Sequence, residues 1–310
     1  MLSLPVIDAH QQFWDPGRHA ALGPPGPPAP LDRAYEAADL VPELELEHVT
    51  GSVLVGLLHA TDETRRLLAM ARSVPFVHGV VGWVDLTAAH VAGDIERLRS
   101  GRGGELLVGL SHRAHDEPDA GWLLRDDVRR GIAAVGAADL AFDLQVTTRE
   151  LPAAYELCAA HPGMRFVLDH LGRPPIASGD LSAWGRALLP LAELPNVSAK
   201  ISGLVTEADW LTWSIDDLRD PVELAIDAFG ARRLMLGSDW PICLLAGSYT
   251  DVIDSARYLL AELPVHLQDE IRGGTAVRVY RLGRPIDQRR STEGDDQRRP
   301  LEGDDPPTRA

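Results

Sequence analysis

The segment Val6-Ile7-Asp8-Ala9-His10-Gln11-Gln12-Phe13-Trp14 begins as an apolar run and ends in polar, histidine-bearing residues. Three later apolar runs end in the same way, within residues 109–112, 166–170 and 234–240, and each ends on a His or an Asp motif. When strands run parallel, their carboxyl ends meet at one edge of the sheet, where catalytic groups gather. We therefore predict that four distant parts of the chain assemble one site.

Apolar runs alternate with segments of helical spacing along most of the chain. Besides the opening segment, the predicted strands are 53–58, 76–84, 106–110, 140–146, 165–169, 197–201 and 234–237. The predicted helices are 39–48, 62–72, 88–98, 126–135, 151–160, 181–191, 221–229, 249–262 and 267–271. Continuously apolar strands indicate burial on both faces and therefore a parallel sheet. Eight strand–helix units over about 280 residues predict an α/β fold, a (β/α)8 TIM barrel.

The alternative fold is a doubly wound open sheet, which is disfavoured because no glycine-rich phosphate loop follows an early strand. We expect one barrel domain over residues 1–282 and a disordered polar tail over 283–310. The tail repeats Glu-Gly-Asp-Asp at 293–296 and 302–305 and has few apolar residues, so it cannot bury enough surface to fold. The proline-rich segment 23–30 predicts an extended loop, either a lid over the site or a solvated insertion.

The composition limits the partners. The 310 residues are 45% hydrophobic and carry a formal net charge of −16, which argues against a nucleic-acid partner and gives no support for an anionic membrane surface. No apolar run approaches the roughly 20 residues of a membrane span, and no signal peptide is visible, so we expect a cytoplasmic protein. Cys158 and Cys243 are far apart and predict reduced, buried thiols. The expected partner is a small-molecule substrate; the sequence does not predict an oligomeric state.

Several chemically capable side chains fall at or near predicted strand ends: His10, Trp83, His112, Asp143, His170, Lys200 and Asp239. Histidines and carboxylates together either bind a divalent metal ion or act as acid and base without one. Lys200 is the only lysine of the chain. Each residue taken singly also has a structural interpretation: Asp8 is favoured as a loop anchor, and Asp143 needs a partner because an unpaired buried carboxylate is costly. The remaining histidines, among them His59, are assigned to the surface or to the surroundings of the site.

Five segments in this order resemble the amidohydrolase superfamily, most closely its sugar-lactonase and dicarboxylate-lactonase branch. They are 8–14 (DAHQQFW), 81–86 (VGWVDL), 166–174 (FVLDHLGRP), 200–204 (KISGL) and 237–241 (GSDWP), and the match runs from residue 5 to about residue 282. The resemblance implies a (β/α)8 barrel and hydrolysis of a lactone or similar carboxyl ester. It also implies that the Asp at the end of the eighth strand, here Asp239, activates water. Some members of this superfamily use one divalent metal ion and others use none.

The chain departs from the family pattern at several positions. Gln12 stands where the family has the second His of His-x-His, and an amide oxygen is a poorer ligand for zinc-like metals than imidazole. Ser111 stands where an Arg usually precedes the His, which removes a guanidinium suited to a substrate carboxylate. Gly56 replaces a usual Gln and Thr275 a usual Asn. We expect Gln12, Ser111 and Gly56 to face the mouth of the barrel.

The resulting prediction is a lactonase in which Asp239 is the general base, held by His10 and His170. His112 and Lys200 are predicted to polarise the carbonyl group or to stabilise the oxyanion. The predicted substrate-binding residues are Trp83, Ser111, Asp143, Gln12 and Trp240. If one divalent metal ion (Zn or Mn) is bound, the expected ligands are His10, His170 and Asp239, with Gln12 as a marginal fourth; a metal-free site is equally compatible with the sequence. The alternatives are a catalytically impaired barrel that binds a small molecule or partner, and a metal-assisted decarboxylase.

Overall fold

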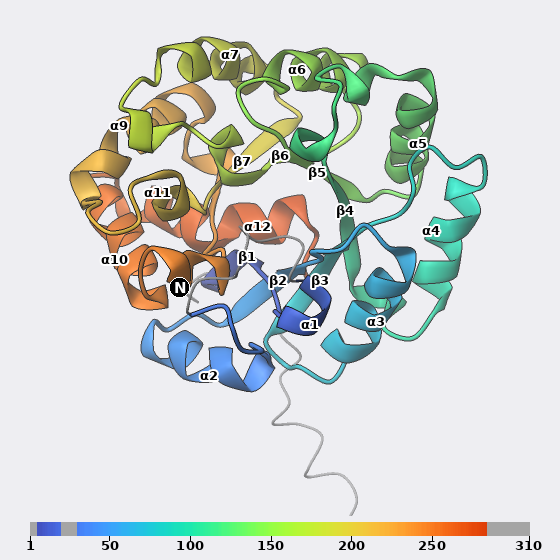
Figure 1. The fold of residues 1–310 in the computed structure, drawn as a ribbon, viewed down its shortest axis with the longest axis horizontal. Coiled ribbons are helices and arrows are strands. Elements are labelled where there is room, and N and C mark those ends of the chain that lie inside the picture. The colour runs from blue at the N-terminus through green and yellow to red at the C-terminus, as the bar shows by residue number, and fades with distance from the viewer. Residues whose placement is uncertain (1–4, 20–29, 284–310) are drawn as a thin grey trace, which may run out of the picture.

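The computed structural model describes residues 5–19 and 30–283, and it contains all eight predicted strands. They are β1 (Ile7–Gln11), β2 (Gly51–Val55), β3 (Val77–Gly82), β4 (Leu107–Arg113), β5 (Ala141–Gln145), β6 (Phe166–Leu168), β7 (Val197–Ile201) and β8 (Leu234–Leu236). Each strand pairs in parallel with the next one in the chain. A parallel bridge between Gln11 and Trp240 joins the two ends of the sheet and nearly closes the barrel (Figure 1). The predicted (β/α)8 barrel is confirmed.

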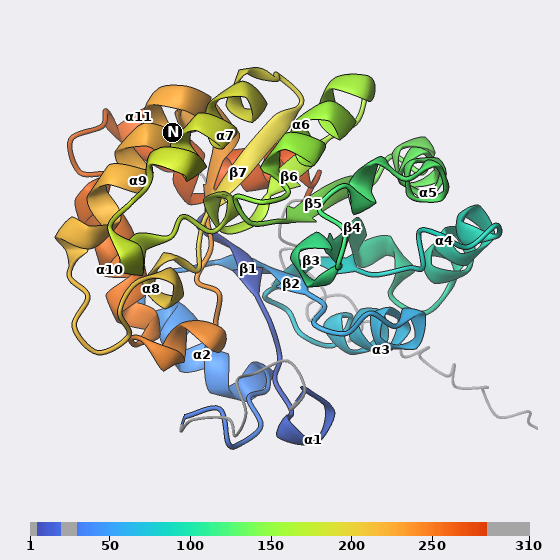
Figure 2. The same ribbon diagram turned by 45° about the horizontal axis from the view of Figure 1, so that its top comes forward.

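Helices surround the strands as an outer layer (Figure 2). They are α1 (Pro16–His19), α2 (Ala37–Leu46), α3 (Thr61–Ala71), α4 (Val91–Ser100), α5 (Asp126–Ala137), α6 (Leu151–Ala160), α7 (Ser182–Glu193), α8 (Leu204–Glu207), α9 (Ile215–Phe229), α10 (Tyr249–Leu259), α11 (Val265–Asp269) and α12 (Thr275–Val279). No helix among the described residues is long and apolar enough to cross a membrane.

Most strand residues are apolar because both faces of the strands are buried. In β2, Val53 and Val55 pack inside the barrel, whereas Leu54 between them packs in the layer under the helices. Side chains of a strand alternate between its two faces, so most positions carry an apolar residue, and buried polar residues such as Asp143 and Lys200 need partners. The barrel interior is therefore a packed core and not a pore.

Helix α9 begins six residues before the predicted start at Pro221. Ser214 precedes the helix, and its backbone N–H and hydroxyl both donate to the Asp217 carboxylate, at 2.7 and 3.0 Å. This capping box satisfies groups at the first turn, and Leu218 and Val222 are buried. Capping and burial together offset the cost of a proline inside the helix, which made Pro221 look like a helix start.

The floor of the barrel is closed by a helix that the sequence did not predict. Helix α12 follows α11 through a π-helical turn at Glu270–Gly274 and runs across the middle of the ring of helices (Figure 1). Ala276, Val279 and Tyr280 pack against the barrel-interior residues of the strands. Gly273 permits this approach, because a Cβ there would lie 1.8 Å from the carbonyl oxygen of Pro5.

Cys158 and Cys243 are buried and free, as predicted. Residues 284–310 of the predicted tail and residues 20–29, which include most of the proline-rich segment, lie outside the described residues. Whether that segment is a lid and whether the tail is disordered therefore stay predictions.

Candidate active site

The seam between β8 and β1 builds the centre of the site. The backbone N–H of Asp239 donates to the His10 carbonyl at 2.8 Å, and that of Gln12 donates to the Trp240 carbonyl at 2.8 Å. Asp8 anchors the seam from below, since its carboxylate accepts from the Ser238 N–H at 2.9 Å and from the Ser238 hydroxyl at 2.6 Å. The interpretation of Asp8 as a loop anchor is confirmed. These bonds fix Asp239 beside the end of β1.

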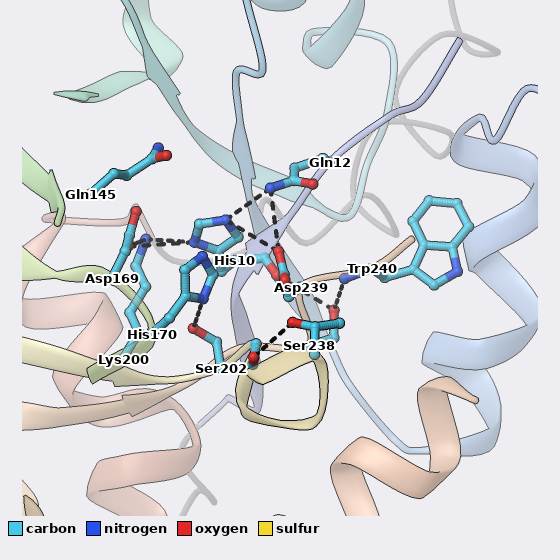
Figure 3. Close-up of polar contacts among 12 residues, drawn as sticks. His10, Gln12, Gln145, Asp169, His170, Lys200, Ser202, Ser238, Asp239 and Trp240 are labelled. Carbon is cyan, nitrogen blue, oxygen red and sulfur yellow. Dashed lines mark hydrogen bonds and ion pairs between the residues drawn. The ribbon is translucent and has the colours of Figure 1, made fainter. Parts of the chain in front are cut away.

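His10, Gln12 and Asp239 form a buried cluster at this seam (Figure 3). The Gln12 amide nitrogen lies 3.0 Å from His10 Nε2 and 3.3 Å from Asp239 Oδ1. His10 Nε2 and Asp239 Oδ1 are 3.7 Å apart. The amide of Gln12 therefore bridges the imidazole and the carboxyl group, and its assigned orientation follows from these two contacts.

His170 reaches the cluster from a strained turn after β6. Residues 170–173 all have positive φ, although only Gly172 is a glycine, and Asp239 has φ of 59°. Left-handed backbone in a non-glycine residue is unfavourable and is found where the surrounding structure fixes it, often at active sites. The hydroxyl of Ser202 fixes the ring of His170, with Oγ 2.9 Å from Nδ1. The turn thus aims His170 at His10, whose ring centroid is 4.5 Å away.

The same turn presents Arg173 near the site. Its Nη1 pairs with the Glu207 carboxylate at 2.8 Å, and its Nε is buried without a hydrogen-bond partner among the described residues. The positive charge of Arg173 acts on three groups of the site. It is one of the causes that lower the pKa of His10 and His170, and it opposes the rise in the pKa of Asp239. An arginine with a donor left over is suited to bind an oxygen of a ligand.

A fully buried charge cluster lies behind His10. Lys200 Nζ is 2.7 Å from Asp143 Oδ2, 2.8 Å from Asp169 Oδ1 and 3.3 Å from His10 Nδ1. Tyr280, from the floor of the barrel, donates to Asp143 Oδ2 at 2.6 Å. Asp143 therefore has the partners that its burial required, and the side chains of Lys200 and Asp143 are both 0% exposed.

Burial sets the protonation of the central groups. Desolvation raises the pKa of Asp239 to about 8, against the opposing effect of Arg173. Burial likewise lowers the pKa of His10 and His170, because it disfavours the charged imidazolium. Both imidazoles are therefore neutral at pH 7 and able to accept a hydrogen bond or to bind a metal ion.

Known proteins are similar in sequence to this chain over most of its length. The family model for amidohydrolases matches residues 7–282. The chain belongs to the amidohydrolase family. This amidohydrolase is 40% identical to an L-fucono-1,5-lactonase of Burkholderia multivorans, over 91% of this chain and 98% of that protein. It is 38% identical to an L-fucono-1,5-lactonase of Burkholderia ambifaria, over 90% of this chain and 96% of that protein.

Solved structures show the same fold. A crystal structure of an amidohydrolase from Burkholderia multivorans with bound zinc has a TM-score of 0.84 and 36% identity, and the match covers 90% of this chain and 100% of that chain. The resemblance drawn from the sequence motifs is confirmed, and so is the barrel fold.

The donor set of this amidohydrolase fits one divalent metal ion. His10, His170 and Asp239 present nitrogen and oxygen atoms within 4.8 Å of one another, and two imidazoles with a carboxylate form a common zinc donor set. Contacts to Nδ1 of both rings leave both Nε2 atoms for an ion. Gln12 Oε1 is buried without a hydrogen-bond partner among the described residues, so a rotated amide would offer a fourth ligand.

His112, for which we predicted a catalytic role, has both ring nitrogens in contact with other side chains. Trp83 Nε1 donates to His112 Nδ1 at 3.0 Å, and His112 Nε2 lies 2.8 Å from the Glu117 carboxylate. Its ring is stacked between His59 and Trp122, with centroids 4.3 and 3.9 Å away. With both nitrogens engaged and both faces covered, His112 belongs to an aromatic wall at the ends of β3 and β4.

Lys200, which we predicted to polarise a substrate carbonyl, is also held by other side chains of the protein. Its ammonium group is fully buried and shared by Asp143 and Asp169, so no donor reaches the mouth. The same burial removes Asp143 from the predicted substrate-binding residues. A carboxylate inside an apolar strand needs a cation, and the only lysine of the chain supplies it.

The other predicted substrate-binding residues differ in placement. Gln12 lies in the central cluster, and Trp83 is half-buried in the aromatic wall. Ser111 is buried and accepts a long bond of 3.4 Å from the Gln145 amide. The Trp240 ring turns away from Asp239 (Figure 3) and lies edge-on to Tyr35, 5.4 Å between centroids. There it lines a separate cavity of about 330 Å³ beside α2.

Two further outcomes concern residues outside that set. We expected Gly56 to face the mouth of the barrel, but this was wrong. A Cβ at this position would lie 3.2 Å from Leu67 of α3, so Gly56 faces the helix layer. Asp169, Arg173 and His59 belong to the site or its wall but were not selected from the sequence. Asp169 precedes His170 in the quoted motif, and both reach the same cluster because the turn after β6 has left-handed backbone from His170 on.

Proposed function

We propose that this amidohydrolase hydrolyses the ester bond of a sugar 1,5-lactone. The observation that carries the reaction type is Asp239, a carboxyl group of raised pKa held at the end of a barrel strand between two neutral imidazoles. The substrate class is supported by the two L-fucono-1,5-lactonases, which match at 40% and 38% identity over nearly their whole length.

In the proposed reaction, water attacks the carbonyl carbon of the lactone while the ionised form of Asp239, whose share rises as the pH approaches 8, accepts a proton from that water. The bond between the carbonyl carbon and the ring oxygen then breaks, and Asp239 returns the proton to that oxygen. The product is an open-chain hydroxy acid. Gln12 and His10 hold the carboxyl group of Asp239 in position through the contacts at 3.3 and 3.7 Å.

Stabilisation of the oxyanion, which we had assigned to His112 and Lys200, is reassigned to Arg173. Its charge acts on the pKa of Asp239, and its side chain is 31% exposed, so the guanidinium group is accessible to a substrate oxygen. A fixed donor at a developing oxyanion lowers the barrier by several kcal/mol. The half-buried rings of Trp83 and His59, stacked at 5.5 Å between centroids, are proposed to pack against the sugar ring.

His10, His170 and Asp239 would hold the metal ion, which we propose to be zinc, with manganese as the alternative. When bound, the ion would polarise the lactone carbonyl or the attacking water. The zinc-containing amidohydrolase structure at 36% identity supports the choice of zinc. Elemental analysis of the purified protein, repeated after chelation, tests both the occupancy and the identity of the metal.

The function is tested by acid release from L-fucono-1,5-lactone, with D-glucono-1,5-lactone and a sugar 1,4-lactone for comparison, after subtraction of spontaneous hydrolysis. We expect turnover that Asp239→Asn lowers by about 10²- to 10⁴-fold. Asp180→Asn, which changes an exposed carboxylate that accepts from the Ser182 N–H at the start of α7, is the control and should leave turnover unchanged. Absence of enzymatic hydrolysis of every lactone would refute the proposal and favour a binding protein or a decarboxylase.

A further inference from the structure

The ring of His10 has two different neighbours on its Nδ1 side. Asp169 Oδ1 lies 3.4 Å from Nδ1 and Lys200 Nζ lies 3.3 Å from it, and the side chains of both neighbours are fully buried (Figure 3). A carboxylate can only accept a hydrogen bond, whereas an ammonium group can only donate one. The two neighbours therefore favour opposite tautomers of the same imidazole.

The tautomer decides what the other nitrogen can do. If Nδ1 carries the proton and donates to Asp169, Nε2 has a free electron pair and can accept from the Gln12 amide or bind a metal ion. If Nδ1 accepts from Lys200, Nε2 carries the proton and can do neither. The Gln12 amide nitrogen, which is a donor in its assigned orientation, lies 3.0 Å from Nε2 and so favours the first tautomer.

The lysine is already occupied by stronger partners. Its two short contacts, 2.7 Å to Asp143 and 2.8 Å to Asp169, are both to carboxylate oxygens, which are better acceptors for an ammonium group than a neutral ring. Asp143 is itself held by the Tyr280 hydroxyl at 2.6 Å. The lysine thus interacts mainly with the two carboxylates. Both oxygens of Asp169 are buried without a hydrogen-bond partner among the described residues, so Asp169 has acceptor capacity left for Nδ1 at 3.4 Å.

We propose that Asp169 is a positioning residue, which fixes His10 in the tautomer with a proton on Nδ1 and leaves Nε2 free for the site. Lys200, Asp143 and Tyr280 support Asp169 from the barrel floor. This role rests on the proposed function in one respect, namely that the site is the lactonase site. The tautomer itself is a property of the folded protein without substrate.

Charge balance makes Asp169→Ala a practical test. In the wild type two carboxylates share one ammonium group, whereas in Asp169→Ala the Asp143–Lys200 pair remains, one charge of each sign. Lys200→Met leaves two buried carboxylates with no cation, which is strongly destabilising. Asp169→Ala also leaves Lys200, a donor, as the charged neighbour of Nδ1, so His10 is expected to change tautomer.

The tautomer is measured by long-range nitrogen–proton NMR of metal-free protein with ¹⁵N-labelled histidine, the His10 signals being those missing from His10→Gln. We expect an unprotonated Nε2 in the wild type and a protonated Nε2 in Asp169→Ala. A protonated Nε2 in the wild type, which is measured whether or not the variant folds, would overturn the proposal. So would a folded Asp169→Ala protein that keeps the wild-type tautomer.

Zinc affinity supplies a second readout, measured by competition with a chromophoric chelator. Asp169→Ala is expected to weaken binding by about 10- to 100-fold, as for other residues that orient a metal-binding histidine. Glu63→Ala is the matched control, since it removes another buried carboxylate, which pairs with Arg18 and Arg66. Equal zinc affinity in Asp169→Ala and wild type would contradict the proposal. Failure of the lactone assay alone would count against the proposed function and not against this one.

Discussion

Replacement of Gln12 by methionine separates the catalytic contribution of this residue from its contribution to stability. Gln12→Met keeps an unbranched chain of similar length but removes the amide that contacts His10 and Asp239. Loss of these two hydrogen bonds costs about 1–3 kcal/mol in total. The variant also removes Oε1, which is buried without a partner among the described residues, and this gains about 1–3 kcal/mol. The two terms nearly cancel, so we expect the free energy of unfolding to change by less than about 1 kcal/mol.

Catalysis by the same variant should fall. A hydrogen bond to a charged group contributes about 1.5–3 kcal/mol, which at 1.4 kcal/mol per factor of ten corresponds to about 10- to 100-fold in kcat for lactone hydrolysis. Urea unfolding and steady-state kinetics measure the two effects. Gln268→Met is the control, because its amide donates to the Leu263 carbonyl at 2.8 Å, on helix α11 away from the site. Wild-type kcat in Gln12→Met, or a loss of several kcal/mol in stability, would refute this reasoning.

Three other outcomes follow from the geometry. Gly203→Ala should lower stability by about 1–2 kcal/mol for its positive φ of 62° and abolish most lactone hydrolysis, because the new Cβ would lie 2.6 Å from His170 Nδ1; Gly179→Ala, with φ of 70° and nothing within 4 Å, should lose stability but keep kcat. Burial lowers the pKa of His112 to about 4, so the folded protein binds fewer protons than the unfolded chain below pH 6.5. The contribution of His112 to stability is therefore complete above pH 6.5 and falls by up to about 1.4 kcal/mol per pH unit toward pH 4. Urea unfolding at several pH values measures this slope, which should be smaller in His112→Phe by the amount that one proton contributes. Arg173→Gly relieves a positive φ of 54° and should keep the unfolding free energy within about 1 kcal/mol while kcat falls at least tenfold; a proportional loss of stability would contradict the assigned role.

The sequence was most informative where one physical requirement acts at every position of an element. The strands of a closed barrel are buried on both faces, so all eight could be recognised from mainly apolar runs, although polar residues interrupt β1, β5 and β7. Helix ends were less predictable. Pro221 marked a start in the sequence, but the Ser214–Asp217 capping box begins α9 earlier, and α12 is too short to show a helical period of its own.

For the site, the sequence predicted which strand ends meet but not which way each side chain turns. His10, His170 and Asp239 come together as expected. His112 and Lys200 also lie at strand ends. However, His112 contacts Glu117 and Trp83. Lys200 is held by the carboxylates of Asp143 and Asp169. These partners come from residues far apart in the chain, and no local pattern records them.

The two unusual features of the mouth, its strained backbone and its buried charges, have a common explanation. His170, Leu171, Arg173 and Asp239 all have positive φ without being glycine, at a cost of about 1–2 kcal/mol each, which together is a large part of the 5–15 kcal/mol that stabilises a typical domain. Such a conformation persists only where neighbouring groups hold it, and here Ser202, Glu207 and the β1–β8 seam do so. The buried cluster holds the orientation of His10 in the same way. Stability provided by the barrel core is therefore what allows the mouth to keep side chains in positions that a relaxed backbone would not give them.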